Sequence, residues 1–219
     1  MSRSFMLLIS SGAVLLAGFI FLSFIGGTTV RTPIGPSAPT RAPVSLPVIR
    51  EVSSFSLTNQ LGAPLTRDGL VGRPWAVNLI FTRCPGPCAQ LSGVMRSVQT
   101  ALPTNATSRL LSLTSDPVYD TPSVLAAYAS KFAADPARWF FVTGVESEVR
   151  RLAVKDMMLV LQEKSPERRE SPDDLFLHST AIVILDRKAR VRHVVEGLQP
   201  GAAEAVVTAL TGLEREAAP

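Results

Sequence analysis

Hydrophobic and polar positions divide the chain into stretches of different character. Residues 5–26 are strongly apolar and contain no charged residue, whereas residues 28–47 are rich in Pro, Ser and Thr. From residue 48 onward, apolar runs of strand length alternate with segments whose apolar positions recur at helical spacing. The pattern predicts an N-terminal membrane anchor over residues 1–27, a proline-rich linker over 28–47 and a folded domain over 48–219.

The apolar N-terminal stretch is long enough to cross a bilayer core of about 30 Å as a single helix. A cleaved signal peptide would have a shorter apolar centre of about 7–15 residues and a small-residue cleavage site, which Ser23 and Gly26-Gly27 match only loosely. We therefore favour an uncleaved transmembrane helix, with cleavage as the alternative. The prolines that follow are spaced so that no helix can persist, which predicts a semi-extended tether.

The folded part is predicted to be an α/β domain, because strand and helix patterns alternate along it. A hairpin is expected over residues 55–66, and the charged stretch 162–174 is typical of a mobile surface loop. Further strands are expected over residues 75–81, 109–113, 139–142, 157–161, 179–185 and 191–195. Helices are expected over residues 89–102, from 121 onward, over 146–154 and over 201–213. These elements imply a sheet covered by helices on both faces.

The two cysteines of the chain lie where a buried strand passes into a helix. Cys84 and Cys88 enclose the interval Pro85-Gly86-Pro87, between the apolar run 75–81 and the amphipathic segment 89–102. Unpaired backbone N–H groups and the positive end of the helix dipole favour a thiolate at such a position. Thiolates attack disulfides and bind soft metals, and a structural disulfide is the plainer alternative.

Length and charge indicate a single folded domain and give no sign of nucleic-acid binding. With 219 residues, the chain has room for one domain of ordinary size. The net charge of +4 comes from basic residues scattered singly and in pairs, so no nucleic-acid partner is suggested. Met157 and Met158, in an apolar run, are expected in the core, and His193 is expected to be a solvated strand residue.

Separate motifs follow one another along the folded domain. They are Phe81-x-x-Cys84-x-x-x-Cys88, Ser115-Asp116-Pro117-x-x-Asp120-Thr121-Pro122 and Leu177-His178-Ser179-Thr180. Together they resemble the Sco/SenC family of thioredoxin-like proteins, whose members are membrane-tethered copper chaperones for cytochrome c oxidase. The resemblance implies a thioredoxin-like fold with an N-terminal hairpin extension, preceded by a single transmembrane helix. It also implies an inner-membrane protein whose folded domain lies on the periplasmic side.

By this resemblance, Cys84, Cys88 and His178 would bind a copper ion. Two thiolates and one imidazole form a soft ligand set that suits Cu(I) and can also hold Cu(II) or Zn(II). Such a small set leaves room for an acceptor to bind the metal before the donor releases it. Asp116 and Asp120 belong to a loop that lies near the metal in the family, where they would orient the ligands or contact a partner. Ordinary turn and helix-cap chemistry is the equal alternative for these two carboxylates.

The cysteine motif departs from the usual family pattern, Cys-Pro-Asp-x-Cys-Pro. Gly86 stands where the acidic residue is usual, Ala89 follows the second cysteine, and Arg83 precedes the first. The absence of a negative charge and the presence of an adjacent guanidinium both favour a thiolate. The ligand positions are all retained, so copper binding is less affected than the choice of acceptor.

Two functions follow from these observations. In the first, the protein is a copper-binding metallochaperone and not an enzyme. It delivers copper to the binuclear copper site of cytochrome c oxidase, with that subunit and other copper chaperones or thiol reductants as partners. In the second, it is a membrane-anchored thiol–disulfide oxidoreductase that reduces cysteines of that subunit or of another exported protein. His178 distinguishes the two, because copper chelation needs the imidazole whereas dithiol exchange needs only the cysteine pair.

Overall fold

A computed structural model of the chain describes residues 46–216. These residues form one compact unit. The predicted anchor and nearly all of the predicted linker lie outside the described residues. No helix within residues 46–216 has both the length and the apolar character that a membrane crossing needs.

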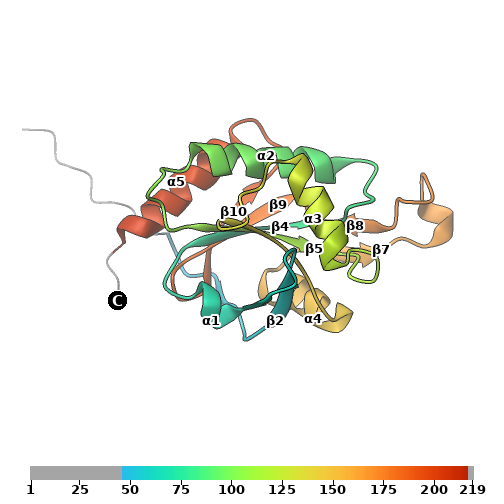
Figure 1. Cartoon of the computed structure of the whole chain (residues 1–219), viewed down its shortest axis with the longest axis horizontal. Helices are drawn as coiled ribbons and strands as arrows, with labels where there is room; N and C mark the ends of the chain where they lie inside the picture. The colour runs from blue at the N-terminus through green and yellow to red at the C-terminus, as the bar shows by residue number, and fades with distance from the viewer. Residues whose placement is uncertain (1–45, 217–219) are drawn as a thin grey trace, which may run out of the picture. The chain divides into compact units, whose positions relative to one another are not determined.

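A mixed sheet forms the centre of the domain, and its middle strands are parallel (Figure 1). These are β4 (Trp75–Ile80), β5 (Arg109–Thr114) and β6 (Trp139–Thr143). Every residue of β4 is buried, as expected for a strand with helices on both faces of its sheet. Antiparallel strands extend the sheet on both sides, in the order β1-β10-β9-β4-β5-β6-β2-β3. Their bounds are β1 (Arg50–Glu51), β2 (Ser56–Asn59), β3 (Pro64–Thr66), β9 (Ala181–Leu185) and β10 (Arg190–Glu196).

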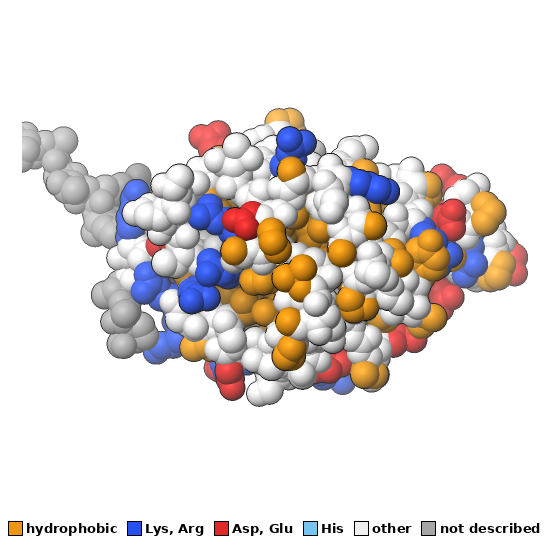
Figure 2. Space-filling model, in the orientation of Figure 1, with side chains coloured by type: hydrophobic (Ala, Val, Ile, Leu, Met, Phe, Trp, Pro, Cys, Tyr) orange, Lys and Arg blue, Asp and Glu red, His pale blue; other side chains and the backbone are white. Residues whose placement is uncertain are grey.

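Helices cover both faces of this sheet, and each face has its own apolar cluster. In Figure 1, α2 (Pro87–Ala101), α3 (Pro122–Lys131) and α5 (Ala202–Arg215) lie on one side. The short helices α1 (Arg67–Leu70) and α4 (Glu146–Arg150) lie on the other, and α4 continues into the π-helical turn η1 (Arg151–Asp156). Basic and acidic side chains are interspersed over the face shown in Figure 2, with apolar side chains gathered across its middle.

A second, much smaller sheet lies beside the main one. It consists of β7 (Leu161–Glu163) and β8 (Phe176–His178), which pair antiparallel with each other. The segment between them contains the 3₁₀ turn η2 (Pro166–Arg168). An ion pair between Lys164 and Asp174, with N–O distances of 2.7–2.8 Å, closes this segment at its base. The stretch predicted as a mobile surface loop therefore includes a strand, a helical turn and a partly buried ion pair.

Most predicted elements are confirmed within a residue or two of their ends. The hairpin over residues 55–66 corresponds to β2 and β3. The helix predicted from residue 121 is α3, in which Thr121 is the N-cap and Pro122 occupies the first turn. The strand predicted over 179–185 begins only at Ala181.

The strand predicted over residues 157–161 is wrong for most of its length. Residues 157–160 are irregular, and β7 begins only at Leu161. Met158 has a φ of 57°, a left-handed conformation that cannot continue a strand. As a result Met157 is buried as expected, whereas Met158 is 42% exposed instead of lying in the core.

Gly197, just after β10, lies where the helix of the cysteine motif meets the sheet. A Cβ atom at this position would lie 2.3 Å from Leu91 Cδ1 on α2 and 2.5 Å from the carbonyl oxygen of Thr180. The backbone carbonyl cannot move away without disturbing the start of β9. Only glycine therefore allows α2 to pack this closely.

We expect Gly197→Ala to destabilise the domain by about 2 kcal/mol, because it overpacks a close backbone contact. The corresponding decrease in Tm is roughly 4–8 °C for a domain of this size. Gly212→Ala is the matched control, because a Cβ at Gly212, inside α5, meets nothing within 4 Å. The control should be neutral or slightly stabilising. Equal Tm values for the two variants, measured by calorimetry, would contradict the packing argument.

Candidate metal centre

The local sequence explains how the cysteines are placed. After β4 ends, Phe81 is still buried, and the chain then turns, with the Cys84 N–H donating to the Phe81 carbonyl at 3.2 Å. Pro87 begins α2, where the missing proline N–H has no helical partner to lose. This arrangement leaves Cys84 partly exposed on the turn and places Cys88, 1% exposed, in the first turn of α2. Both are free cysteines.

His178 reaches the cysteines from the end of β8. Its Nδ1 lies 3.0 Å from the carbonyl oxygen of Ser179, and because a carbonyl only accepts, Nδ1–H is the donor. The lone pair of Nε2 is then free to face the sulfur of Cys88, 3.1 Å away. The ring also meets Phe81 edge-on, with the ring centroids 5.6 Å apart. The imidazole is thus oriented before any metal binds.

The predicted ligand atoms are brought together. The sulfurs of Cys84 and Cys88 and a ring nitrogen of His178 all lie within 4.8 Å of one another. Metal–sulfur and metal–nitrogen bonds are about 2.0–2.3 Å long, so one ion can reach all three atoms with little rearrangement. No other group of three or more His, Cys, Asp or Glu side chains in residues 46–216 is arranged in this way. The donor set is soft and fits Cu(I) well.

The two thiols differ strongly in acidity. A hydrogen bond from the Cys88 thiol is the largest cause that lowers the pKa of Cys84, to about 4, although burial opposes it. The backbone N–H groups of Cys88 and Gly86 lower this pKa further, as the position at a helix N-terminus predicts. The pKa of Cys88 is raised, chiefly because its proton is held by Cys84 and secondly because it is buried. In the metal-free site Cys84 is therefore the thiolate and Cys88 the thiol.

Asp120 holds the start of the cysteine turn through hydrogen bonds. Its side chain is fully buried and accepts hydrogen bonds from the N–H of Thr82 at 3.1 Å and from the hydroxyls of Thr82 and Thr114 at 2.5 Å. Burial is the main reason that the pKa of Asp120 is raised. These bonds fix the backbone two residues before Cys84. Sequence reasoning did not single out Thr82 or Thr114, although both follow apolar strand runs whose ends meet at one edge of the sheet.

Asp116 lies on the same loop and pairs with Arg83, whose Nη2 atom is 2.6 Å from Oδ2 of the carboxylate. The backbone N–H of Asp116 also donates to the hydroxyl of Thr114 at 2.9 Å. The Arg83 guanidinium, which was expected to favour a thiolate at Cys84, is thus paired with the Asp116 carboxylate. The hydrogen bond from Cys88 is instead the largest cause that lowers the pKa of Cys84.

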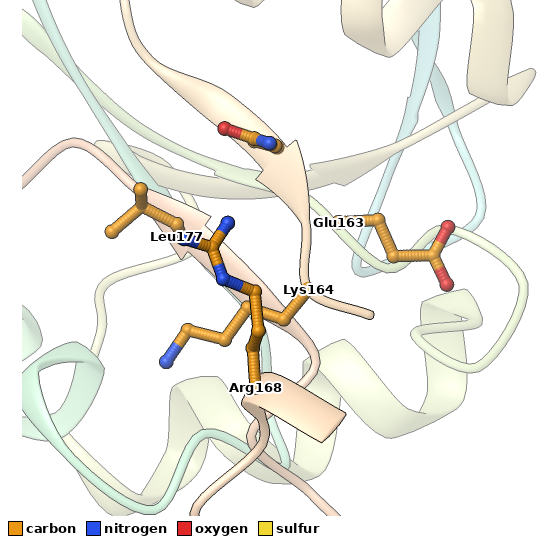
Figure 3. Close-up of a pocket in the computed structure, with 5 residues that line it drawn as sticks. Glu163, Lys164, Arg168 and Leu177 are labelled. Carbon is orange, nitrogen blue, oxygen red and sulfur yellow. The ribbon is translucent and has the colours of Figure 1, made fainter. Parts of the chain in front are cut away.

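The site opens into a hollow of about 450 Å³. Cys84, His178 and the turn Pro85–Pro87 form one part of its wall, and Lys164 and Asp174 from the segment between β7 and β8 form another. A neighbouring hollow of about 230 Å³ shares Lys164 and Leu177 with it. In Figure 3 the Arg168 side chain extends toward Leu177, whereas Glu163 points away. The charged segment predicted as a plain surface loop is therefore part of the rim of the candidate site.

We expect Cys84 to be a thiolate throughout the neutral range in the reduced, metal-free protein. Because its pKa is depressed to about 4, the thiolate becomes protonated only as the pH falls toward that value. Alkylation of Cys84 by iodoacetamide, followed by mass spectrometry, should proceed at a nearly constant rate between about pH 6 and pH 9. Cys88→Ala removes the main hydrogen-bond donor and should make that rate rise with pH. A wild-type rate that climbs steeply above about pH 8 would contradict this assignment.

Known proteins with similar sequences belong to the family that the cysteine and histidine motifs resemble. The family model described as SCO1/SenC matches residues 46–213. The SCO1 protein homolog of Bacillus subtilis is 26% identical over 183 residues, which cover 83% of this chain and 84% of that protein.

Solved structures share the fold. BsSco, a member of the Sco family of cytochrome c oxidase assembly proteins, superposes with a TM-score of 0.68 at 23% identity and covers 80% of this chain and 99% of its own. Bradyrhizobium japonicum ScoI with copper bound gives a TM-score of 0.63 at 21% identity, with coverage of 74% and 99%. The predicted thioredoxin-like α/β fold is therefore confirmed for the described domain, and the chain belongs to the SCO1/SenC family.

Proposed function

We propose that this protein is a copper-binding metallochaperone that delivers copper to the binuclear copper site of cytochrome c oxidase. The observation that carries the proposal is the convergence of Cys84, Cys88 and His178 within 4.8 Å at the edge of an open hollow. Support comes from ScoI of Bradyrhizobium japonicum, which holds copper, and from BsSco, whose family assembles cytochrome c oxidase. Copper is the cargo in this proposal, and the side chains act as exchangeable ligands.

The ligand groups are suited to loading and release. Cys84 is already a thiolate and lies on the exposed turn, so it can meet an incoming ion first. His178 then offers the lone pair of Nε2, and Cys88 binds with loss of its proton. Since three ligands leave a position open, an acceptor thiolate can enter from the hollow before Cys84 dissociates.

The same proposal includes a location and partners. A helix over residues 5–26 would anchor the chain in the inner membrane, with the folded domain on the periplasmic side. The apolar, uncharged sequence of that stretch supports the anchor. The partners would be the copper-site subunit of the oxidase, with other copper chaperones or thiol reductants acting before or after delivery.

The asymmetry of the thiols favours a second candidate, a thiol–disulfide oxidoreductase. The Cys84 thiolate would attack a target disulfide and release one target thiolate. Cys88 would then lose its proton and attack the Cys84 sulfur, which releases the second target thiolate and leaves a Cys84–Cys88 disulfide. A dithiol reductant would restore the pair. A disulfide switch has been identified in BsSco, which supports redox activity of such a pair.

His178→Ala should separate these candidates. Loss of an outer group that orients a ligand costs about 10–100-fold in metal affinity, so loss of a ligand should weaken Cu(I) binding by at least about 100-fold. The measurement is an anaerobic Cu(I) competition titration of the full chain with a chromophoric chelator. His193→Ala is the matched control, since His193 is the only other histidine and lies on β10, away from the cysteines.

Different results would support different functions. A tight one-to-one complex that is lost in His178→Ala and kept in His193→Ala supports the chaperone. Binding that is weak, or indifferent to His178, overturns it. If His178→Ala also reduces a model disulfide peptide as fast as the wild type does, the oxidoreductase becomes the better account.

A further inference from the structure

Arg83, beside the first cysteine, contacts three groups at once. Its Nη2 atom lies 2.6 Å from Oδ2 of Asp116, and its Nη1 atom lies 3.6 Å from Oδ1 of Asp173. Its guanidinium carbon lies 4.1 Å from the centroid of the Tyr119 ring, within the range of a cation–π contact. The side chain is 31% exposed, compared with 9% for Asp116 and 54% for Asp173. The Asp116 contact is therefore the strong one, and the Asp173 contact is an outer one.

These contacts join segments that carry different parts of the metal site. Asp116 and Tyr119 belong to the loop between β5 and α3, which supports the cysteine turn through Asp120. Asp173 lies just before β8, whose last residue is His178. Arg83 itself directly precedes Cys84. One guanidinium thus links the turn of one ligand to the segment that positions another.

His178 is paired with Leu161 in the ladder of β7 and β8, but no ladder among the described strands joins β8 to the strand that leads into the cysteine turn, so its position against that turn depends on such links. β8 pairs with β7 and is not part of the main sheet, which carries the cysteine turn. The contacts that hold β8 against the turn are between side chains. Phe81 packs edge-on against Phe176, with centroids 5.4 Å apart, and against His178, and Arg83 reaches Asp173.

We propose that Arg83 is a positioning residue of the metal site, which clamps the Cys84 turn to the Asp116 loop and to the segment leading into His178 so that the ligands stay assembled without metal. The part of this proposal that concerns copper rests on the proposed function, and the part that concerns the metal-free protein does not. An arginine suits this role because its planar fork can engage two carboxylates while its face rests on an aromatic ring.

Hydrogen exchange of the reduced, metal-free full chain tests the clamp directly. In Arg83→Gln, amides of residues 171–178 should exchange about fivefold faster than in the wild type, because the link to Asp173 is lost. Asp173→Asn removes only this outer link and should give about a two- to fivefold increase in the same amides. The double variant should exchange no faster than Arg83→Gln alone, since both changes remove one shared contact.

Arg190→Gln is the matched control. Arg190, the first residue of β10, is 32% exposed and forms an ion pair with the buried Asp186 at 2.7 Å, and its loss should leave exchange in residues 171–178 unchanged. Arg83→Lys retains the charge, but a single ammonium cannot span both carboxylates, so it should restore only part of the protection. Wild-type protection in Arg83→Gln, or full protection in Arg83→Lys, would overturn the clamp.

Cu(I) titration of the same variants adds a second readout. Arg83→Gln should weaken binding by about tenfold, much less than loss of a ligand, because the ligands remain but are no longer held together. Unchanged affinity in Arg83→Gln would overturn the role in metal binding while leaving the proposed chaperone intact. If the wild type binds no Cu(I), the proposed function fails, and the exchange measurements still decide whether Arg83 positions His178.

Discussion

The parallel pairing of β4 with β5 is the constraint on which the site depends. Ile80 is in register with Thr114, and the pairing continues one step further because the N–H of Ser115 donates to the carbonyl of Ile80 at 2.7 Å. The chain therefore leaves both strands side by side at their carboxyl ends. There Asp120, from the loop after β5, accepts hydrogen bonds from the backbone N–H and the hydroxyl of Thr82, which lies in the loop after β4. Asp116 pairs with Arg83 between the same two loops. Ligands in α/β sheets commonly bind at such an edge, and here the edge supplies both sulfurs.

The histidine has a different structural origin. It comes from a two-stranded sheet that contacts the cysteine turn through side chains, of which Phe81 and Arg83 are the clearest. The sulfurs therefore lie on the rigid part of the fold, whereas the imidazole lies on a part attached by fewer contacts. A two-stranded ribbon opens more readily than the strands of a central ladder. The imidazole is therefore the ligand with the weaker backbone support.

The parts of the fold with strong local signals were predictable. β4 is an apolar run interrupted only by Asn78, the apolar positions of α2 recur at helical spacing, and α3 begins with Thr121-Pro122, so the sequence alone places these elements within about two residues of their ends. β7 and β8 were not found as a pair, because strands of three residues carry little periodicity and their pairing is a tertiary effect. Met158 was assigned to a strand because nothing in its neighbours signals a left-handed residue.

In the candidate site, too, features with a local sequence signal were predictable, whereas features that arise from tertiary packing were not. The thiolate at Cys84 follows from its place at a helix N-terminus, but the main hydrogen bond from Cys88 required coordinates. His178 was found only through the family resemblance, since 90 positions separate it from Cys88. The partners of Arg83 were not predictable, because Asp116 and Asp173 approach it through tertiary packing.

Protons and a metal ion compete for the sulfurs of the site. Cys84 needs no deprotonation to bind an ion, whereas Cys88 must lose a proton that Cys84 and burial both hold in place. A bound ion replaces that proton between the two sulfurs. When the ion leaves, a proton can return to Cys88 and restore the hydrogen bond to the Cys84 thiolate. Proton return therefore stabilises the metal-free site and competes with rebinding of the ion.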